Sequence, residues 1–445
     1  MKPQAISIPA VARVHTARLL AGPVIAFLAA GAMFILAGRI LAAETPVPAT
    51  PEKSLIYAGW YGSTLPSPSF IAQNIAFLES QPFNGMVVYA RSSSLNINAT
   101  TAVMKDVPIS YESIASVLAP ISGLNSPRLR DNFALVMGSD PPDFFDDWST
   151  TLQNFGNLAR AVKDAGLRGV MFDNEQYFSP WGNYPSGVAY PLMTLAQYQA
   201  QAVLRGRQVM EAMVAEFPEI IVITLHGPYI SEPDAPEALD FPQWQSANEL
   251  LGPFFAGFQE GSSAPGQNVD GGELYTLRSV SEFQESYDWR RFDLPSSAVD
   301  CAFISSASRS SWSDMISISY GIYDRPFGGA SMDPSILTTT LTNAFASSDR
   351  WVWFYAEDNT YLRPEAQGGA SAEWVAAVRA ALPVAVEPAP DPIPDPPAPP
   401  APVLMGAPIP TDDGHSSRCG LLGMEVLPIF LALALARSRR RVRRV

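Results

Sequence analysis

Two acidic residues that follow one apolar run give the chain its most specific chemical signal. Asp173 and Glu175 come directly after the strand-like segment Arg168–Phe172 and are separated by a single residue. In an extended segment, residues at this spacing point to the same side. Two carboxyl groups in one cavity can divide acid–base work, because one donates a proton while the other accepts a proton or attacks as a nucleophile. The pair therefore predicts a catalytic site.

Further candidates follow other apolar runs. Glu273 follows the run Asn268–Asp270, and Glu357 follows the run Trp351–Tyr355. His226 follows a third run and is a candidate substrate contact. The other residues that we expect to bind substrate are aromatic: Trp60, Tyr61, Tyr89, Tyr177, Trp181, Tyr275, Trp353 and Tyr355. Carboxylate pairs beside aromatic rings are typical of sites that hydrolyse glycosidic bonds.

An alternation of strands and helices must position these residues. Eight apolar runs read as buried strands, and stretches with helical spacing separate them. The runs are Leu55–Trp60, Gly85–Tyr89, Phe133–Met137, Arg168–Phe172, Ile220–Leu225, Asn268–Asp270, Val299–Ile304 and Trp351–Tyr355. This α/β pattern predicts a (β/α)8 TIM barrel, in which the carboxyl ends of the strands build the active site. An open doubly wound α/β sheet is the alternative. The first strand is not followed by GxGxxG, and the chain has no Walker sequence, which argues against nucleotide binding.

Composition narrows the function. The chain has 445 residues, of which 47% are hydrophobic, so it has ample material for a core. The net charge of −14 makes nucleic acid an unfavourable partner. The two cysteines exclude a disulfide scaffold or a cysteine-rich cluster, and the three histidines exclude a histidine-rich metal site. We therefore predict no cofactor and no metal.

The two ends of the chain read as targeting segments. Leu19 to Leu36 is an apolar run after a basic start, which is typical of a signal peptide or an N-terminal anchor. A Pro-rich spacer precedes the C-terminal segment. The predicted organisation is a signal peptide or anchor (1–43), a tether (44–53), a catalytic-like (β/α)8 domain (54–383), a Pro/Ala-rich linker (384–416) and a C-terminal sorting or membrane segment (417–445).

The C-terminal segment combines a short motif around Cys419, an apolar stretch and an Arg-rich tail. Together these resemble the MYXO-CTERM and PEP-CTERM sorting signals of bacteria. The resemblance implies that a membrane-bound sorting protease cleaves near Cys419 and leaves the protein on the cell surface. A plain C-terminal membrane anchor is the alternative. In both cases the positive-inside rule keeps the Arg tail in the cytoplasm and the central domain outside it.

The segment Gly169–Glu175 resembles the fourth-strand segment of family 18 chitinases, which ends Asp-x-Glu, and more loosely that of endo-β-N-acetylglucosaminidases. The resemblance implies that Glu175 is the general acid and that Asp173 helps to hold the acetamido group of the substrate, which is the nucleophile. Met171 stands where the fuller chitinase pattern has a further Asp. Asn174 with Glu175 also matches the Asn-Glu of the large retaining clan, but its strand-seven Glu has no equivalent at the end of the predicted seventh strand.

The sequence thus predicts an exported, surface-anchored glycoside hydrolase that acts on a polysaccharide or glycan. Glu175 is its acid, Asp173 orients Glu175 or the substrate, and Glu273 or Glu357 is the second carboxylate. The alternative is a non-catalytic carbohydrate-binding or scaffold protein on the same barrel. The separation of the carboxyl groups discriminates: about 5–5.5 Å indicates a retaining pair, and about 6.5–9.5 Å an inverting pair.

Overall fold

The computed structural model describes residues 52–59, 66–176, 179–231, 248–296, 301, 303–324, 332–356 and 360–383. The predicted N-terminal targeting segment, linker and C-terminal sorting segment with Cys419 lie outside these ranges. So do four of the predicted site residues, which are Trp60, Tyr61, Tyr177 and Glu357. Within the ranges, no helix combines the length and the apolar character needed to cross a bilayer.

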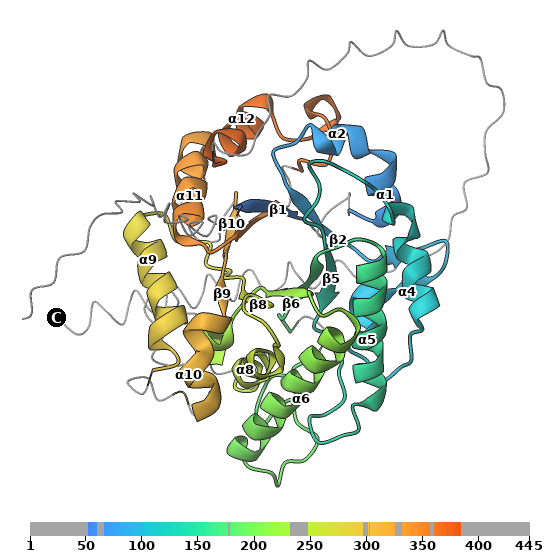
Figure 1. Cartoon of the computed structure of the whole chain (residues 1–445), viewed down its shortest axis with the longest axis vertical. Coiled ribbons are helices and arrows are strands. Elements are labelled where there is room, and N and C mark those ends of the chain that lie inside the picture. The colour runs from blue at the N-terminus through green and yellow to red at the C-terminus, as the bar shows by residue number, and fades with distance from the viewer. Residues whose placement is uncertain are drawn as a thin grey trace, which may run out of the picture. The chain divides into compact units, whose positions relative to one another are not determined.

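A parallel sheet forms the centre of the molecule, and helices surround it (Figure 1). Its strands are β1 (Ser54–Ala58), β2 (Gly85–Val88), β5 (Phe133–Met137), β6 (Gly169–Asp173), β7 (Ile221–Thr224), β8 (Asn268–Asp270), β9 (Ser317–Ile318), β10 (Tyr320–Tyr323) and β11 (Trp351–Tyr355). The strand order is β10-β11-β1-β2-β5-β6-β7-β8-β9, and every neighbouring pair is parallel.

The sheet closes into a barrel through β9 and β10. Only Ser319 separates these two strands, and Ser319 N–H donates to Asp270 O at 2.8 Å. β9 pairs with β8 and β10 pairs with β11, so one stretch of chain joins both edges of the sheet. β9 and β10 together occupy one position, which gives eight strand positions. The structure confirms the (β/α)8 TIM barrel, and the alternative of an open sheet is wrong.

Helices run around the ring of strands in Figure 1. They are α1 (Pro68–Gln73), α2 (Ile75–Glu79), α3 (Ala99–Ala102), α4 (Tyr111–Leu118), α5 (Ser149–Asp164), α6 (Leu195–Glu216), α8 (Leu251–Gly261), α9 (Val280–Asp288), α10 (Ser306–Met315), α11 (Pro334–Ser347) and α12 (Ala372–Ala381). A small hairpin of β3 (Arg91–Ser92) and β4 (Ile97–Asn98) precedes α3. Local signals set the helix starts: Ser67 caps α1 before Pro68, and Thr194 with Gln197 forms a capping box on α6.

Two apolar cores lie on the two faces of the sheet. The inner core fills the barrel and includes Phe133, Met171 and Trp353, whereas the outer core lies between the strands and the helices. On β6 the faces alternate, because Met171 belongs to the inner core and Phe172 packs against Phe255 of α8. By this alternation Asp173 faces the inside of the barrel, as Met171 does. The two-residue alternation of the strand therefore places Asp173 on the inner face at the mouth of the barrel.

The predicted seventh strand, Val299–Ile304, is wrong. Its described residues Cys301, Phe303 and Ile304 lie in irregular chain and a turn before α10, and Cys301 is buried. The strand is Ser317–Tyr323, divided into β9 and β10. Short apolar runs do not distinguish a strand from a buried turn. The serines make the true strand look polar, yet Ser319 is buried and its hydroxyl donates to Trp351 O at 2.9 Å.

Candidate active site

Three carboxylates and one histidine converge at the carboxyl ends of three adjacent strands. Asp173 ends β6 and Glu175 follows it, His226 follows β7, and Glu273 follows β8. One oxygen of Glu175, one ring nitrogen of His226 and one oxygen of Glu273 lie within 4.8 Å of one another. The barrel thus brings together residues that the sequence singled out separately. Among the described residues Glu273 is the predicted second carboxylate that lies against Glu175, and Glu357 lies outside them.

Hydrogen bonds fix the end of β6. Asp173 Oδ1 accepts from the Glu175 N–H at 3.2 Å, which holds the two acids in one short turn. Asn174 points elsewhere and clamps β6 to β7: its Nδ2 donates to His226 O at 2.8 Å, and its Oδ1 accepts from the His226 N–H at 3.1 Å. In the sequence Asn174 stood out only as part of a motif. Its place between Asp173 and Glu175 in an extended segment puts its amide side chain on the opposite face, which indicates a structural role.

A buried ion pair fixes the end of β8. Arg290, whose side chain is 0% exposed, donates to Asp270 Oδ1 at 2.8 Å. The same oxygen accepts from the Gly272 N–H at 3.1 Å. Gly272 has a φ of +57°, and a Cβ there would lie 2.5 Å from Arg290 Nη1, so only glycine fits this turn. Arg290 is remote in the sequence from the strand end that it holds, so no sequence pattern marked it as part of the site.

Glu273 leaves this turn in a defined direction. Its N–H donates to Leu225 O at 2.9 Å, beyond the end of β7. Two residues before Glu273, the carbonyl oxygen of Gly271 accepts a hydrogen bond from Trp353 Nε1 at 2.8 Å. Trp353 is 0% exposed, so it supports the turn from inside the barrel instead of presenting a surface to a ligand. Glu273 keeps 13% of its side-chain surface exposed and can meet a ligand.

His226 lies against Glu273, with 3.5 Å between His226 Nε2 and Glu273 Oε2. His226 is 3% exposed, and burial lowers the pKa of the imidazole to about 3. The ring is therefore neutral at neutral pH, and its contact with Glu273 is not an ion pair. Tyr229 packs edge-on against the imidazole with the ring centroids 6.4 Å apart. A neutral, oriented imidazole can accept a hydrogen bond or ligate a metal.

The pKa values of all three acids are raised. Burial is the main cause that raises the pKa of Asp173 to about 7. Burial, followed by the charge of Asp173, raises the pKa of Glu273 to about 8. Burial, followed by the charges of Glu273 and Asp173, raises the pKa of Glu175 well above its usual value. Glu175 is thus suited to donate a proton, and the pKa of Asp173 lies near neutral pH.

Aromatic side chains line the barrel beside Glu273. The Tyr275 ring lies 5.2 Å from Tyr323, 5.9 Å from Trp353 and 6.3 Å from Tyr355, centroid to centroid. The Tyr275 hydroxyl also donates a hydrogen bond to the Glu273 carboxylate. Tyr323 was missed because it ends the strand that the sequence analysis misplaced. The alternation Ile-Ser-Ile-Ser-Tyr before it was the available signal.

Two further predicted aromatic residues lie near the barrel mouth. Tyr89 follows β2 and packs, half-buried, against the inner core. Trp181 lies in the chain after β6, is nearly buried, and packs on Phe144 and Phe254. Trp181 Nε1 has no hydrogen-bond acceptor among the residues that the structure describes. Trp181 Nε1 and Glu175 O both lie close to Gly138, since a Cβ built on Gly138 would be 3.2 Å from the first and 3.1 Å from the second. The indole donor of Trp181 is therefore near the backbone of Glu175.

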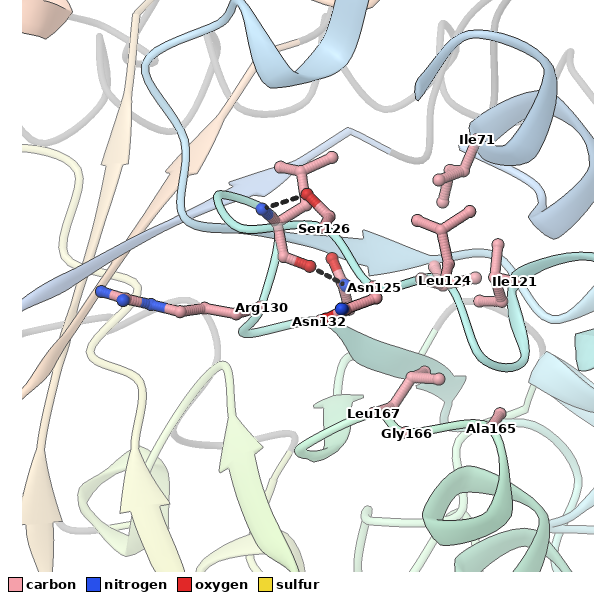
Figure 2. A pocket seen from close by; sticks show the side chains of 12 residues that line it. Ile71, Ile121, Leu124, Asn125, Ser126, Arg130, Asn132, Ala165, Gly166 and Leu167 are labelled. Carbon is pink, nitrogen blue, oxygen red and sulfur yellow. Dashed lines mark hydrogen bonds between the residues drawn. The ribbon is translucent and has the colours of Figure 1, made fainter. Parts of the chain in front are cut away.

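A cavity of about 180 Å³ lies at another place in the barrel wall (Figure 2). Ala165, Gly166 and Leu167, which precede β6, line it together with segments before β5 and after α4. In Figure 2 Ile121 and Leu124 face this space and Arg130 extends away from them. Its lining contains no Asp, Glu or His. It adjoins the amino ends of the strands, where barrels build stability and not catalysis.

The chain matches no model of a known protein family and no curated protein. Among solved structures it is similar to the catalytic domain of a hyperthermophilic chitinase from Pyrococcus furiosus, with 8% identity and a TM-score of 0.39 over 75% of this chain and 95% of that one. A GH5-4 endoglucanase from an uncultured bacterium has 9% identity and a TM-score of 0.38, over 72% of this chain and 85% of that one. A phosphonopyruvate hydrolase has 10% identity and a TM-score of 0.30, over 68% of this chain and 76% of that one. Glycoside hydrolases are thus among its structural neighbours, and the reaction must be inferred from the chain's own residues.

Proposed function

We propose that the chain is a glycoside hydrolase in which Glu175 and Glu273 are the two working carboxylates. The observation that carries the proposal is their separation, because oxygens of the two side chains lie within 4.8 Å of each other at the mouth of the barrel. Carboxyl groups about 5–5.5 Å apart are typical of retaining glycosidases, whereas inverting enzymes need about 6.5–9.5 Å to admit a water molecule. The pair therefore favours the retaining reaction.

In this reaction Glu175 donates its proton to the glycosidic oxygen as the bond from that oxygen to the anomeric carbon breaks. Ionised Glu273 attacks the anomeric carbon and forms a glycosyl ester. Glu175, now ionised, then takes a proton from water, which displaces Glu273 and releases the sugar. The raised pKa of Glu175 supports its role as acid. The Tyr275 hydroxyl, which bonds Glu273, supports the carboxylate in the attacking orientation.

A specific observation favours a second mechanism on the same site. Asp173 is 0% exposed, and its Oδ2 has no hydrogen-bond donor in the described ranges. The N–H of a substrate acetamido group would fill that position, and the acetamido oxygen would then attack the anomeric carbon in place of Glu273. This is the role that the resemblance to family 18 chitinases implies for Asp173. It would make an N-acetylated glycan the substrate.

The test is turnover of polysaccharides and aryl glycosides, including N-acetylglucosaminides, by the full chain and three variants. Glu175→Gln should lower the rate by about 10²–10⁴ in either mechanism. Glu273→Gln should lower it as much if Glu273 is the nucleophile, and far less if the substrate supplies the nucleophile. Glu211→Gln, on the exposed face of α6, is the matched control and should retain the full rate.

Wild-type turnover by Glu175→Gln would overturn the assignment of the acid. Failure of the wild-type chain to hydrolyse any of these substrates, together with its retention on a polysaccharide column, would favour the carbohydrate-binding or scaffold protein.

We also infer export and retention at the cell surface, with the membrane and a sorting protease as partners. The terminal sequence patterns support this inference, and they lie outside the described residues. Fractionation of cells that express the full chain or Cys419→Ser tests it. Processing near Cys419 predicts a shorter, surface-exposed wild-type protein and an unprocessed variant. Equal sizes and a cytoplasmic location for both would contradict it.

A further inference from the structure

We propose that Glu175, His226 and Glu273 form a binding site for a divalent first-row transition metal ion, for which Zn²⁺ is the probe. The site goes beyond the proposed hydrolysis, since metal binding needs no substrate. Three ligand atoms, one from each residue, lie within 4.8 Å of one another. They come from the ends of three adjacent strands, so the rigid barrel holds them.

The distances fit a metal ion after a small adjustment. Zinc binds imidazole nitrogen and carboxylate oxygen at about 2.0–2.2 Å, so tetrahedral ligand atoms are about 3.4 Å apart. The distance of 3.5 Å between His226 Nε2 and Glu273 Oε2 already has this value. Glu175, which is partly exposed, can complete the set by a side-chain rotation. Three protein ligands would leave one position for water, as in zinc sites that bind small molecules.

The surrounding residues orient the ligands. Asn174 bonds both main-chain groups of His226, at 2.8 Å and 3.1 Å, and so fixes the position from which the imidazole reaches the site. The Asp270–Arg290 pair fixes the turn that carries Glu273. Partners of this kind commonly change metal affinity by about 10–100-fold when they are removed. His226 and Glu273 are therefore held by separate hydrogen-bonded supports.

Asp173 is an independent observation that points to a cationic ligand. It is buried, and its Oδ2 has no donor in the described part of the chain. A metal-bound water could donate to Asp173 Oδ2. The imidazole favours a transition metal over Ca²⁺ or Mg²⁺, which take oxygen ligands.

A metal ion in this position would coordinate the oxygen with which Glu175 donates its proton. If the proposed function holds, Zn²⁺ therefore inhibits hydrolysis and a chelator restores it. This consequence rests on the proposed function, whereas metal binding does not.

The test is calorimetric titration of Zn²⁺ into the chelator-treated full chain, with Co²⁺ absorption as a second readout of tetrahedral coordination. We expect one site per chain that Glu175→Gln, His226→Gln and Glu273→Gln each weaken by more than about 100-fold, while Glu211→Gln leaves it unchanged. Zn²⁺ should also raise the melting temperature of the wild-type chain but not of the three variants. Thermal unfolding without metal identifies any variant that is not folded, and Glu175→Gln, at a partly exposed position, then decides.

No Zn²⁺ binding by the wild-type chain, or the same affinity in the folded Glu175→Gln variant, would overturn the metal site. His15 and His415 lie outside the trio, so binding through them would persist in all the variants. Because no substrate is used, metal binding without hydrolysis would leave this inference standing and count only against the proposed function.

Discussion

Three carboxyl groups at the ends of β6 and β8 determine the chemistry at the scale of residues, and Asp173 is buried whereas Glu175 and Glu273 are partly exposed. They share the same low-dielectric surroundings, so each resists ionisation of the next. Burial raises the pKa of all three: that of Asp173 to about 7, that of Glu273 to about 8, and that of Glu175 well above its usual value. Asp173 and Glu175 were foreseeable from the two-residue spacing on a strand. Their closeness to Glu273 was not, because it depends on how far each strand extends before its turn.

The first prediction concerns the pH dependence of hydrolysis. The nucleophile Glu273 must be ionised, so kcat/KM should rise about tenfold per pH unit and level off near pH 8. It should fall again at the higher pH where Glu175 loses its proton. Initial rates between pH 5 and 10 with a chelator present measure this profile. Asp173→Asn should move the rising limb to lower pH, because the Asp173 charge raises the pKa of Glu273. A rising limb at the ordinary pKa of a glutamate would contradict the assignment.

The second prediction concerns stability. The pKa of Asp173 is raised from 3.8 to about 7 in the folded chain, so the folded state holds the proton more tightly than the unfolded state. The stabilisation is complete below about pH 4 and is lost as the pH rises to about 7, a difference on the order of 4 kcal/mol. The free energy of unfolding of Asp173→Asn should change less than that of the wild-type chain between pH 4 and 7. Chemical unfolding at several pH values measures this difference.

The surface variant Asp288→Asn is the control, because Asp288 accepts only a surface hydrogen bond from Gln284. A wild-type chain whose free energy of unfolding does not decrease between pH 4 and 7 relative to Asp173→Asn would contradict the stated cause.

At the scale of elements, the ends of β6 and β8 are held by side chains from elsewhere in the chain. Arg290 lies in the helical turn after α9 and reaches Asp270, Ser319 O and Ser286 O from there. It therefore joins β8 to the residue between β9 and β10, where the barrel closes. The sequence offers no spacing rule that links an arginine in a helical turn to a strand end.

The third prediction is that Arg290→Met destabilises the chain by about 3–5 kcal/mol, because it leaves buried Asp270 without its partner. It should also lower kcat, since the turn that carries Glu273 loses an anchor. Arg291→Met is the matched control: Arg291 is the next residue and pairs with the partly exposed Asp349 at 2.7 Å. A loss of stability no greater than that of Arg291→Met would contradict the role of the buried pair.

The fourth prediction concerns the clamp between β6 and β7. Asn174→Ala removes both partners of the His226 main chain and should cost about 1–3 kcal/mol in the free energy of unfolding. Activity should fall more than stability alone explains, because His226 and Glu175 are no longer held together. Denaturant titration and kcat measured well below the melting temperature separate the two effects. Unchanged stability would show that the clamp is dispensable.

Most strands were foreseeable because their residues form apolar, buried runs, as in Phe133–Met137. The exception, Ser317–Tyr323, shows the limit of that signal. Its serines are satisfied by neighbouring strands, as Ser319 is by Trp351 O, and only the closed barrel supplies those partners. Because the seventh strand was predicted at the wrong place, Tyr323 at its end was not among the predicted site residues.

At the scale of the whole molecule, the barrel separates chemistry from packing. Its carboxyl end gathers the acids, His226 and Tyr275, while the cavity of about 180 Å³ near its amino end is lined without acids or histidine. Closure through β9 and β10 completes the ring, and the pairing of β6, β7 and β8 sets the separation of Glu175 and Glu273. A TIM barrel serves many reactions, so the fold leaves the choice to those side chains.

The anomeric configuration of the first product, followed by proton NMR on the glycoside that the full chain hydrolyses fastest, tests the central claim most directly. Two carboxylates whose oxygens lie within 4.8 Å of each other predict a product that keeps the configuration of the substrate before it mutarotates. An inverted first product would contradict the Glu175–Glu273 pair as acid and nucleophile.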